Sequence, residues 1–288
     1  MKFLRYFYND SEHLGIEKNG KIFELNAFPL SKSFEDMNDF ITNHTKEDMM
    51  VLSNNALDNF VTPDEVKFLS PFERTFHDVI CVGLNYAKHI SEAHANLSTE
   101  DTINATYFSK RAEVISYHES DIILDSEVDS SMDYETELGI ILGKRGKNIP
   151  EDEALDYVFG YTIVNDYSAR ALQKAHNQWY KGKSLDGYTA IGPYIITKDE
   201  FEHPLKLKLT TKVNDELRQD SNTEFMIRGV ENLINDISQG LTLVPGDIIA
   251  TGTPEGVGMG FTPGKFLKAG DKVESYIEGI GSLVNYIK

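Results

Sequence analysis

Short apolar runs separated by turn residues dominate the hydrophobic pattern of the chain. Runs of this length, rich in Val, Ile, Phe and Tyr, predict strands rather than helices. They lie at residues 2–8, 14–17, 22–25, 66–69, 79–82, 122–124, 135–142, 157–164, 205–213, 217–219 and 272–287.

Few stretches have the spacing of a helix. Residues 34–43 form a short helix candidate, and residues 230–240 form an amphipathic one that ends at a glycine. Residues 179–193 are rich in glycine and predict an irregular segment. Because strands dominate and helices are few, we expect a mainly β (α+β) protein rather than a doubly wound parallel sheet.

The pattern also divides the chain. The first 70 residues resemble a small α+β unit without a chemical motif, in which Asn19-Gly20 predicts a hairpin turn. After that point buried strands end in polar motifs. We therefore expect a small N-terminal α+β domain at residues 1–70 and a catalytic domain at residues 71–288.

The amino-acid composition limits the kinds of molecule that this chain can bind. The chain has 288 residues and a formal net charge of −18, so nucleic acid and anionic membranes are unsuitable partners. The single cysteine, Cys81, lies in an apolar run and excludes an intrachain disulfide. Neither a signal peptide nor an apolar run of about 18 residues is present. We expect a cytoplasmic protein, in which any anionic substrate needs a local cation.

Two glutamates at the start of one expected strand are the first chemical candidates. Side chains alternate along a strand, so Glu135 and Glu137 share a face, with Cα atoms roughly 6.6 Å apart. At an effective dielectric constant near 20, their carboxylates repel by roughly 2.5 kcal/mol. On a solvated face salt would screen this repulsion, whereas in a cleft a hard divalent cation would offset it. The spacing alone favours the solvated face, and the rest of the chain reverses that preference.

Other polar residues follow the ends of buried strands. Asn85 is a candidate N-cap of a short helix on which His89 and Glu92, at i and i+3, share a face. Asp166 lies at a strand-to-helix corner, where its alternative role is an N-cap. The polar residues 93–104 have the length of a lid and directly follow the histidine and glutamate.

Five motifs in this order resemble the fumarylacetoacetate hydrolase (FAH) superfamily in its short bacterial form. The resemblance covers roughly residue 76 to the C-terminus, and each motif alone is weak. It implies a mixed β-sandwich roll and a homodimer. The motifs are Val82-Gly83-Leu84-Asn85-Tyr86-Ala87-Lys88-His89, Asp133-Tyr134-Glu135-Thr136-Glu137-Leu138, Asn165-Asp166-Tyr167-Ser168-Ala169-Arg170, Lys181-Gly182-Lys183-Ser184-Leu185-Asp186, and residues 245–258 (Pro245-Gly246-Asp247 to Gly256-Val257-Gly258).

The resemblance implies a metal centre. By it, Glu135, Glu137 and Asp166 hold one Mg²⁺ or Mn²⁺ ion. Three carboxylates on one face agree with that assignment, because they repel one another without a cation. A small anionic keto acid would supply further oxygen ligands.

The resemblance also implies roles for other residues. His89 and Glu92 would form a dyad that activates water, although a lone helix histidine is more often structural. Lys183 would hold a substrate carboxylate or enolate oxygen, and its alternative is an exposed loop lysine. Arg170, Gln173 and Thr253 would bind substrate, with surface or turn positions as their alternatives.

The activity expected from these residues is Mg²⁺-dependent hydrolysis of the C–C bond of acylpyruvate-like 2,4-dioxo acids, through a pyruvate enolate. The same site would serve isomerisation of 2-hydroxydienoate dicarboxylates or decarboxylation of oxaloacetate. A binding protein without catalysis is a further alternative.

Overall fold

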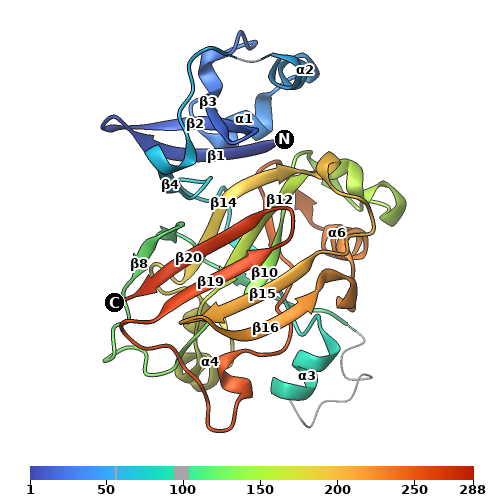
Figure 1. Cartoon of the computed structure of the whole chain (residues 1–288). Helices are drawn as coiled ribbons and strands as arrows, with labels where there is room; N and C mark the ends of the chain where they lie inside the picture. Colours follow the sequence, from blue (N-terminus) through green and yellow to red (C-terminus); the bar gives the residue numbers. More distant parts are fainter. Residues whose placement is uncertain (56, 94–103) are drawn as a thin grey trace.

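Two β-sheets packed face to face form the body of the molecule. The computed structural model describes residues 1–55, 57–93 and 104–288, so the expected lid lies outside the described residues apart from its ends. Figure 1 shows the smaller sheet in front of the larger one, with β20, β19 and β15 crossing over β14, β12 and β10. This mixed sandwich confirms the mainly β fold expected from the sequence.

The larger sheet has eleven strands in the order β3-β2-β1-β14-β12-β10-β18-β5-β6, with β4 paired to β1 and β7 to β14. Most pairs are antiparallel, and β18 with β5 is one parallel exception. Its strands are β1 (Lys2–Tyr8), β2 (Ser11–Lys18), β3 (Lys21–Glu24), β4 (Lys67–Leu69), β5 (Val79–Gly83), β6 (Thr106–Lys110), β7 (Ile115–Ser116), β10 (Thr136–Leu142), β12 (Val158–Asp166), β14 (Thr189–Thr197) and β18 (Ile248–Ala250).

The smaller sheet has five strands in the order β16-β15-β19-β20-β8, and two short ribbons pair β11 with β17 and β13 with β9. The strands are β8 (Ser120–Ile122), β9 (Met132–Asp133), β11 (Gly146–Lys147), β13 (Ser168–Ala169), β15 (Lys208–Val213), β16 (Glu216–Asn222), β17 (Thr242–Leu243), β19 (Lys272–Ile277) and β20 (Gly281–Ile287).

Helices lie at the edges of the sandwich. The α-helices are α1 (Met37–Asn43), α2 (Lys46–Asn54), α3 (Ala87–Ala93), α4 (Arg170–Ala175), α5 (Tyr180–Lys183) and α6 (Val230–Ser238). The 3-10 helices are η1 (Leu25–Ala27), η2 (Pro63–Glu65), η4 (Glu151–Tyr157), η5 (Lys198–Glu200), η6 (Thr223–Phe225) and η7 (Gly258–Gly260). Within the described ranges, none of these helices is long and apolar enough to cross a membrane.

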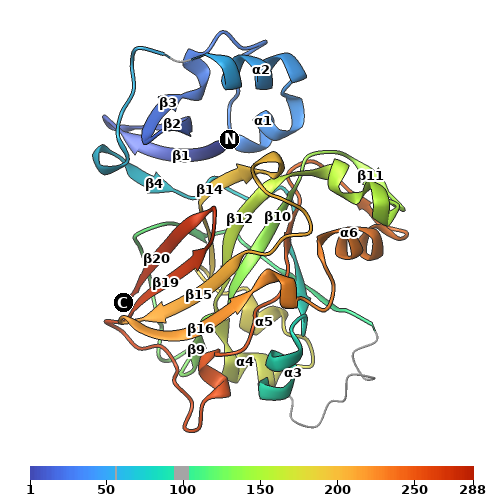
Figure 2. The same cartoon turned by 45° about the vertical axis from the view of Figure 1, so that its right-hand side comes forward.

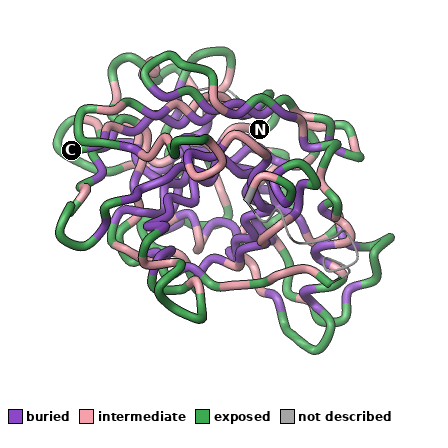
Figure 3. The backbone as a smooth tube through the Cα atoms, turned by 90° about the horizontal axis from the view of Figure 1, so that it is seen from below, coloured by how far each residue is buried: buried purple, intermediate pink, exposed green. Residues whose placement is uncertain are grey.

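Strands β10 and β12 are buried along their whole length because each has packed layers on both faces. In β10, Leu138 and Ile140 belong to the core beneath the smaller sheet, whereas Ile141 belongs to the core on the opposite side. Because side chains alternate along a β-strand, residues of the same strand contribute to two apolar cores. Figure 3 shows this buried interior as the purple segments of the tube.

The N-terminal residues extend the larger sheet, since β1 pairs with β14 in antiparallel register. Phe3 of β1 packs against Phe40 of α1 and Phe159 of β12, with ring centroids 5.0 and 5.7 Å apart. Residues from both sides of position 70 thus share one apolar core. The expected domain boundary stays a prediction.

Several segments differ from the sequence expectations, among them residues 106–110, which form β6 although no strand was expected there. Helix α2 was not expected, although Thr45 and Asp48 form the capping box that marks its start. Residues 179–193 were expected to be irregular, but they contain α5 and the first half of β14. Gly192 and Pro193, at the end of that stretch, lie inside β14, where its pairing with β12 shifts register.

Candidate metal centre and active-site pocket

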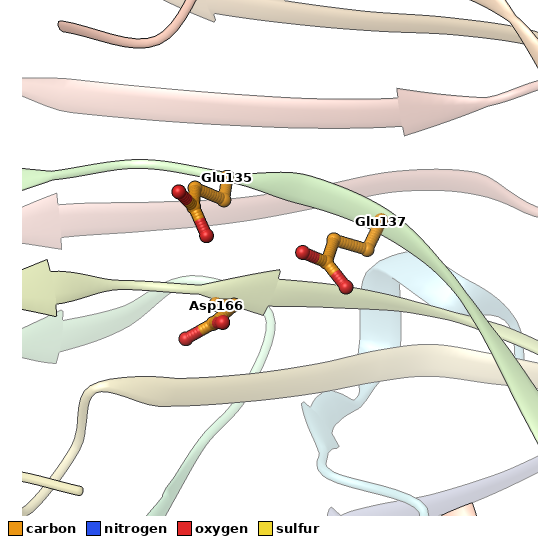
Figure 4. Close-up of side chains that lie close together, drawn as sticks. All are labelled: Glu135, Glu137 and Asp166. Carbon is orange, nitrogen blue, oxygen red and sulfur yellow. The ribbon is translucent and has the colours of Figure 1, made fainter. Parts of the chain in front are cut away.

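Three carboxyl groups meet at one end of the β10–β12 pair. Glu135 directly precedes β10, Glu137 is its second residue, and Asp166 ends β12. Because Thr136 is in register with Asn165, the antiparallel pairing brings the three acids together. One carboxylate oxygen from each lies within 4.8 Å of the others, and Figure 4 shows the three side chains converging.

Burial decides between the two interpretations of the glutamate pair. Glu135, Glu137 and Asp166 are 5%, 2% and 0% exposed, so the solvated-strand interpretation is wrong. The capping role of Asp166 is also wrong, because Ala169 occupies the N-cap of α4. The Asp166 carboxylate instead accepts hydrogen bonds from two lysines.

Lys183 and Arg170 supply positive charge to the acids. Lys183, 2% exposed rather than a solvated loop lysine, donates to Glu135 and to Oδ2 of Asp166, the latter at 2.7 Å. Arg170 donates to Glu135 at 2.5 Å and to Asp133 at 2.9 Å. Burial alone would raise the pKa of Glu135, but the charges of Arg170 and Lys183 outweigh it and hold that pKa well below its ordinary value.

Lys110 is a member of this cluster that sequence reasoning missed. It ends β6, is 0% exposed, and donates to Oδ1 of Asp166 at 2.6 Å and to the carbonyl of Tyr167 at 2.8 Å. Burial lowers the pKa of Lys110 from its ordinary value, against the opposing charge of Asp166. No strand was expected at residues 106–110, so the sequence carried no signal that this lysine would be buried.

The charges in the cluster do not balance. Four buried carboxyl groups, the triad and Asp133, face three cationic side chains, and no ion pair of the described residues includes Glu137. Its carboxylate accepts one hydrogen bond, from the backbone N–H of Gly252 at 2.9 Å. Burial and the charges of Asp166 and Glu135 raise the pKa of Glu137 well above its ordinary value. The donor set therefore fits a hard divalent cation, which would supply the missing positive charge.

A pocket of about 250 Å³ opens over the glutamates. Glu135, Glu137, His89, Lys183, Arg170 and Thr253 all line it. Figure 2 shows α3, α4 and α5 gathered at this end of the sheets. The structure thus brings eight of the nine predicted site residues to one pocket or its acidic base.

His89 reaches the pocket because the chain turns sharply after β5. Leu84 has a φ of 59°, and a Cβ on Gly83 would lie 2.7 Å from the ring of Trp179. Asn85 was expected to cap α3, and that role is wrong. Its amide donates to the carbonyls of Arg228 and Thr251 and accepts from the Arg228 N–H, which anchors the turn instead.

Glu92, the ninth predicted site residue, lies beside His89 in α3 and does not line the pocket. The Nδ1 of His89 lies 3.4 Å from Glu92 Oε2, and both Glu92 oxygens accept from the N–H of Gly256 at 3.1 Å. A Cβ on Gly260 would lie 1.8 Å from the Glu92 carboxylate, so that glycine admits the glutamate. The i, i+3 pairing expected from the sequence is present in α3.

The three expected substrate-binding residues differ in how many of their polar groups are already hydrogen-bonded within the protein. Gln173 accepts from Arg170 at 3.0 Å, and both side chains line the pocket. The hydroxyl of Thr253 donates to the carbonyl of Thr136 at 3.1 Å and accepts from Gln219 at 2.8 Å. The hydroxyl hydrogen of Thr253 is therefore already used in a hydrogen bond to the backbone, although Thr253 lies in the pocket wall.

Fold and site together define a class of metal-dependent enzymes. The family model for the fumarylacetoacetate (FAA) hydrolase C-terminal domain matches residues 78–288, and the chain belongs to this family. This confirms the resemblance found in the motifs. The coarse function follows with it: a metal-dependent enzyme of the FAH type.

The proteins similar to this chain are named as different types of enzyme: a tautomerase, a hydrolase and an isomerase. The chain is 38% identical over 291 residues to oxaloacetate tautomerase YisK of Bacillus subtilis (strain 168), covering 99% of this chain and 96% of that protein. A fumarylacetoacetate hydrolase from psychrophilic Exiguobacterium antarcticum has a TM-score of 0.87 at 36% identity, over 100% of this chain and 99% of that one. A 2-hydroxyhepta-2,4-diene-1,7-dioate isomerase from Mycobacterium marinum has a TM-score of 0.74 at 28% identity, over 100% and 98%.

Proposed function

We propose that this chain interconverts the keto and enol forms of oxaloacetate or a similar 2-oxo acid. The observation that carries the proposal is a single pocket that contains both a candidate metal site and a candidate base. The acidic triad and Lys183 lie at its base, and His89, backed by Glu92, lies in its wall. The similarity to the Bacillus tautomerase over nearly the full chain points to the same reaction.

Glu135, Glu137 and Asp166 would hold the Mg²⁺ or Mn²⁺ ion. When bound, this ion would polarise the keto and carboxylate oxygens of a 2-oxo acid. Lys183 uses two of its three N–H donors on Glu135 and Asp166, so the third can donate to the oxygen that gains negative charge.

His89 would move the proton. A base at C3 takes a proton from that carbon, the C–H electron pair forms the C2–C3 double bond, and the C2 oxygen gains the charge. Glu92 orients the imidazole ring and stabilises its protonated form, which suits the ring to proton transfer. Return of the proton to the C2 oxygen completes the enol, and the reverse sequence regenerates the ketone.

Hydrolysis of 2,4-dioxo acids remains the second candidate. The His89–Glu92 pair favours it, because the same base would serve to activate a water molecule. The two reactions differ in what His89 deprotonates, carbon in one case and water in the other. Substrate structure therefore separates them.

The test uses the full chain stripped of metal with a chelator and reloaded with Mg²⁺ or Mn²⁺. Decay of enol-oxaloacetate, followed by its ultraviolet absorbance, should accelerate only with metal. A panel of acylpyruvates measures hydrolysis on the same preparation. Acceleration with oxaloacetate supports the proposal; acylpyruvate cleavage without it would replace the proposal by the second candidate.

A further inference from the structure

The wall of the pocket changes its chemistry from base to mouth. The carboxylates at the base are nearly inaccessible to solvent. The partly buried residues Phe108 and Trp179 also line the pocket, with ring centroids 5.2 Å apart. Lys174, near the end of α4, and His176, just after it, line the same pocket and are exposed. A ligand that reaches from base to mouth thus passes from acids, past aromatic rings, to potential cations.

The cations at the base are paired with carboxylates, whereas Lys174 at the mouth has no such partner among the described residues. Arg170 donates to Asp133, Glu135 and Gln173, and Lys183 donates to two of the triad acids. Among the described residues, no carboxyl group pairs with Lys174 or His176. Lys174 is therefore the lysine of this pocket whose charge is free to meet a ligand.

His176 has a fixed ring beside this lysine. Its Nδ1 bonds to the carbonyl of Leu172 at 2.9 Å, which orients the imidazole and leaves Nε2 for another partner. Both residues belong to one short stretch at the C-terminal end of α4, where the helix dipole favours positive charge.

We propose that Lys174, with His176 beside it, binds the second carboxylate of a dicarboxylic 2-oxo acid. The inference rests on the proposed function, which places the 2-oxo acid end at the base near the triad. The far end of a short substrate then lies toward the mouth, where a carboxylate meets the free ammonium group. An uncharged acyl tail would leave that group without a partner. The volume of about 250 Å³ suits a small acid.

The experiment compares two ligand pairs that differ only at the far end. Malate and lactate share a 2-hydroxycarboxylate group, and malate alone carries a distal carboxylate. Their binding to the metal-loaded protein is measured by calorimetry. Tautomerisation of oxaloacetate is compared with deuterium exchange at C3 of 2-oxobutanoate, followed by NMR.

The variants are Lys174→Met and a matched control, Lys181→Met, which removes an exposed lysine of α5 outside the pocket lining. In Lys174→Met, malate affinity should fall about tenfold and the KM for oxaloacetate should rise about as much. Lactate binding and 2-oxobutanoate exchange should stay within about twofold. Lys181→Met should behave as the parent.

Equal binding of malate and lactate by the parent, or an unchanged malate preference in Lys174→Met, would overturn this inference. Equal losses for both members of each pair would also overturn it, because they indicate general disruption of the pocket. Failure of the proposed function looks different. The parent would then prefer malate, and lose that preference with Lys174, yet turn over neither oxo acid.

Discussion

The base of the pocket and the helical arm above it are built in different ways. The base sits on β10 and β12, which are buried along both faces, and its charged groups are held by ion pairs with almost no solvent access. The arm is the seven-residue helix α3, whose Glu92 is held by the N–H of Gly256. His89 and Glu92 are 3.4 Å apart at the nearest nitrogen and oxygen, longer than a strong hydrogen bond.

This difference fits two tasks. A metal centre needs carboxylates fixed before the ion arrives, because repulsion would otherwise separate them. A proton-transfer group needs access to ligands and some adjustment of distance, and such groups often tighten only in the complex. Substitutions in the base should therefore affect metal affinity and folding, whereas substitutions in the arm should affect turnover.

The largest expected effect belongs to the arm. His89→Gln should lower kcat about 10²–10⁴-fold, because it removes the general base. Mg²⁺ affinity, measured by calorimetry, should change little, because His89 is not one of the three acids. A variant that turns over within a few-fold of the parent would return His89 to a structural role.

The next effect belongs to the base. Lys110→Met leaves the Asp166 carboxylate with one fewer cation in a site that is 0% exposed. We expect a loss of roughly 3–5 kcal/mol in the free energy of unfolding, measured by urea denaturation.

Its matched control breaks an ion pair of the arm. Lys88 lies 3.4 Å from Glu255 with a side chain that is 77% exposed. Lys88→Met should cost only about 0–1 kcal/mol. Similar losses in the two variants would show that burial does not separate the base from the arm.

Removing the unpaired acid should separate metal binding from folding. Glu137→Gln should weaken Mg²⁺ binding by more than about 100-fold, beyond the usual cost of losing a group that only supports a ligand. The metal-free protein should become more stable, because a repelled, buried carboxyl group is replaced by a neutral amide. Asp129→Asn, at another buried acid outside the triad, is the control and should leave metal affinity unchanged.

The smallest expected effect is a pH dependence. The raised pKa of Glu137 means that the folded, metal-free protein keeps a proton on this group at pH values where an unfolded glutamate is ionised. This contribution to stability is present at low pH and is lost as pH rises through the raised pKa. Metal binding must displace the proton, so affinity should rise about tenfold per pH unit between the ordinary and the raised pKa.

Calorimetry in two buffers of different ionisation enthalpy measures that proton. About one proton should be released per ion in the parent within this pH window, and none from this group in Glu137→Gln. Affinity that is independent of pH across the window would contradict the assignment of the proton to Glu137.

Much of the site could be read from local sequence. The i, i+2 spacing of Glu135 and Glu137 on a strand, and the i, i+3 spacing of His89 and Glu92 on a helix, depend only on backbone geometry. The ordered motifs then identified the family and, with it, the mixed β-sandwich. These features needed no knowledge of distant contacts, because each lies within a few residues of chain.

Only the tertiary structure decided which charges meet. Lys110 binds Asp166 across 56 positions, and Lys183 binds Glu135 across 48, distances at which sequence patterns carry no register. Likewise, Asn85 bonds to Arg228 and Thr251 rather than to its own helix. The sequence by itself determined which acids and bases this protein carries and on which faces. The placing of β10, β12 and β6 in one sheet, driven by burial of their apolar neighbours, left Glu137 as the one acid of the triad without a cationic partner in the described structure, and so decided where a metal ion fits.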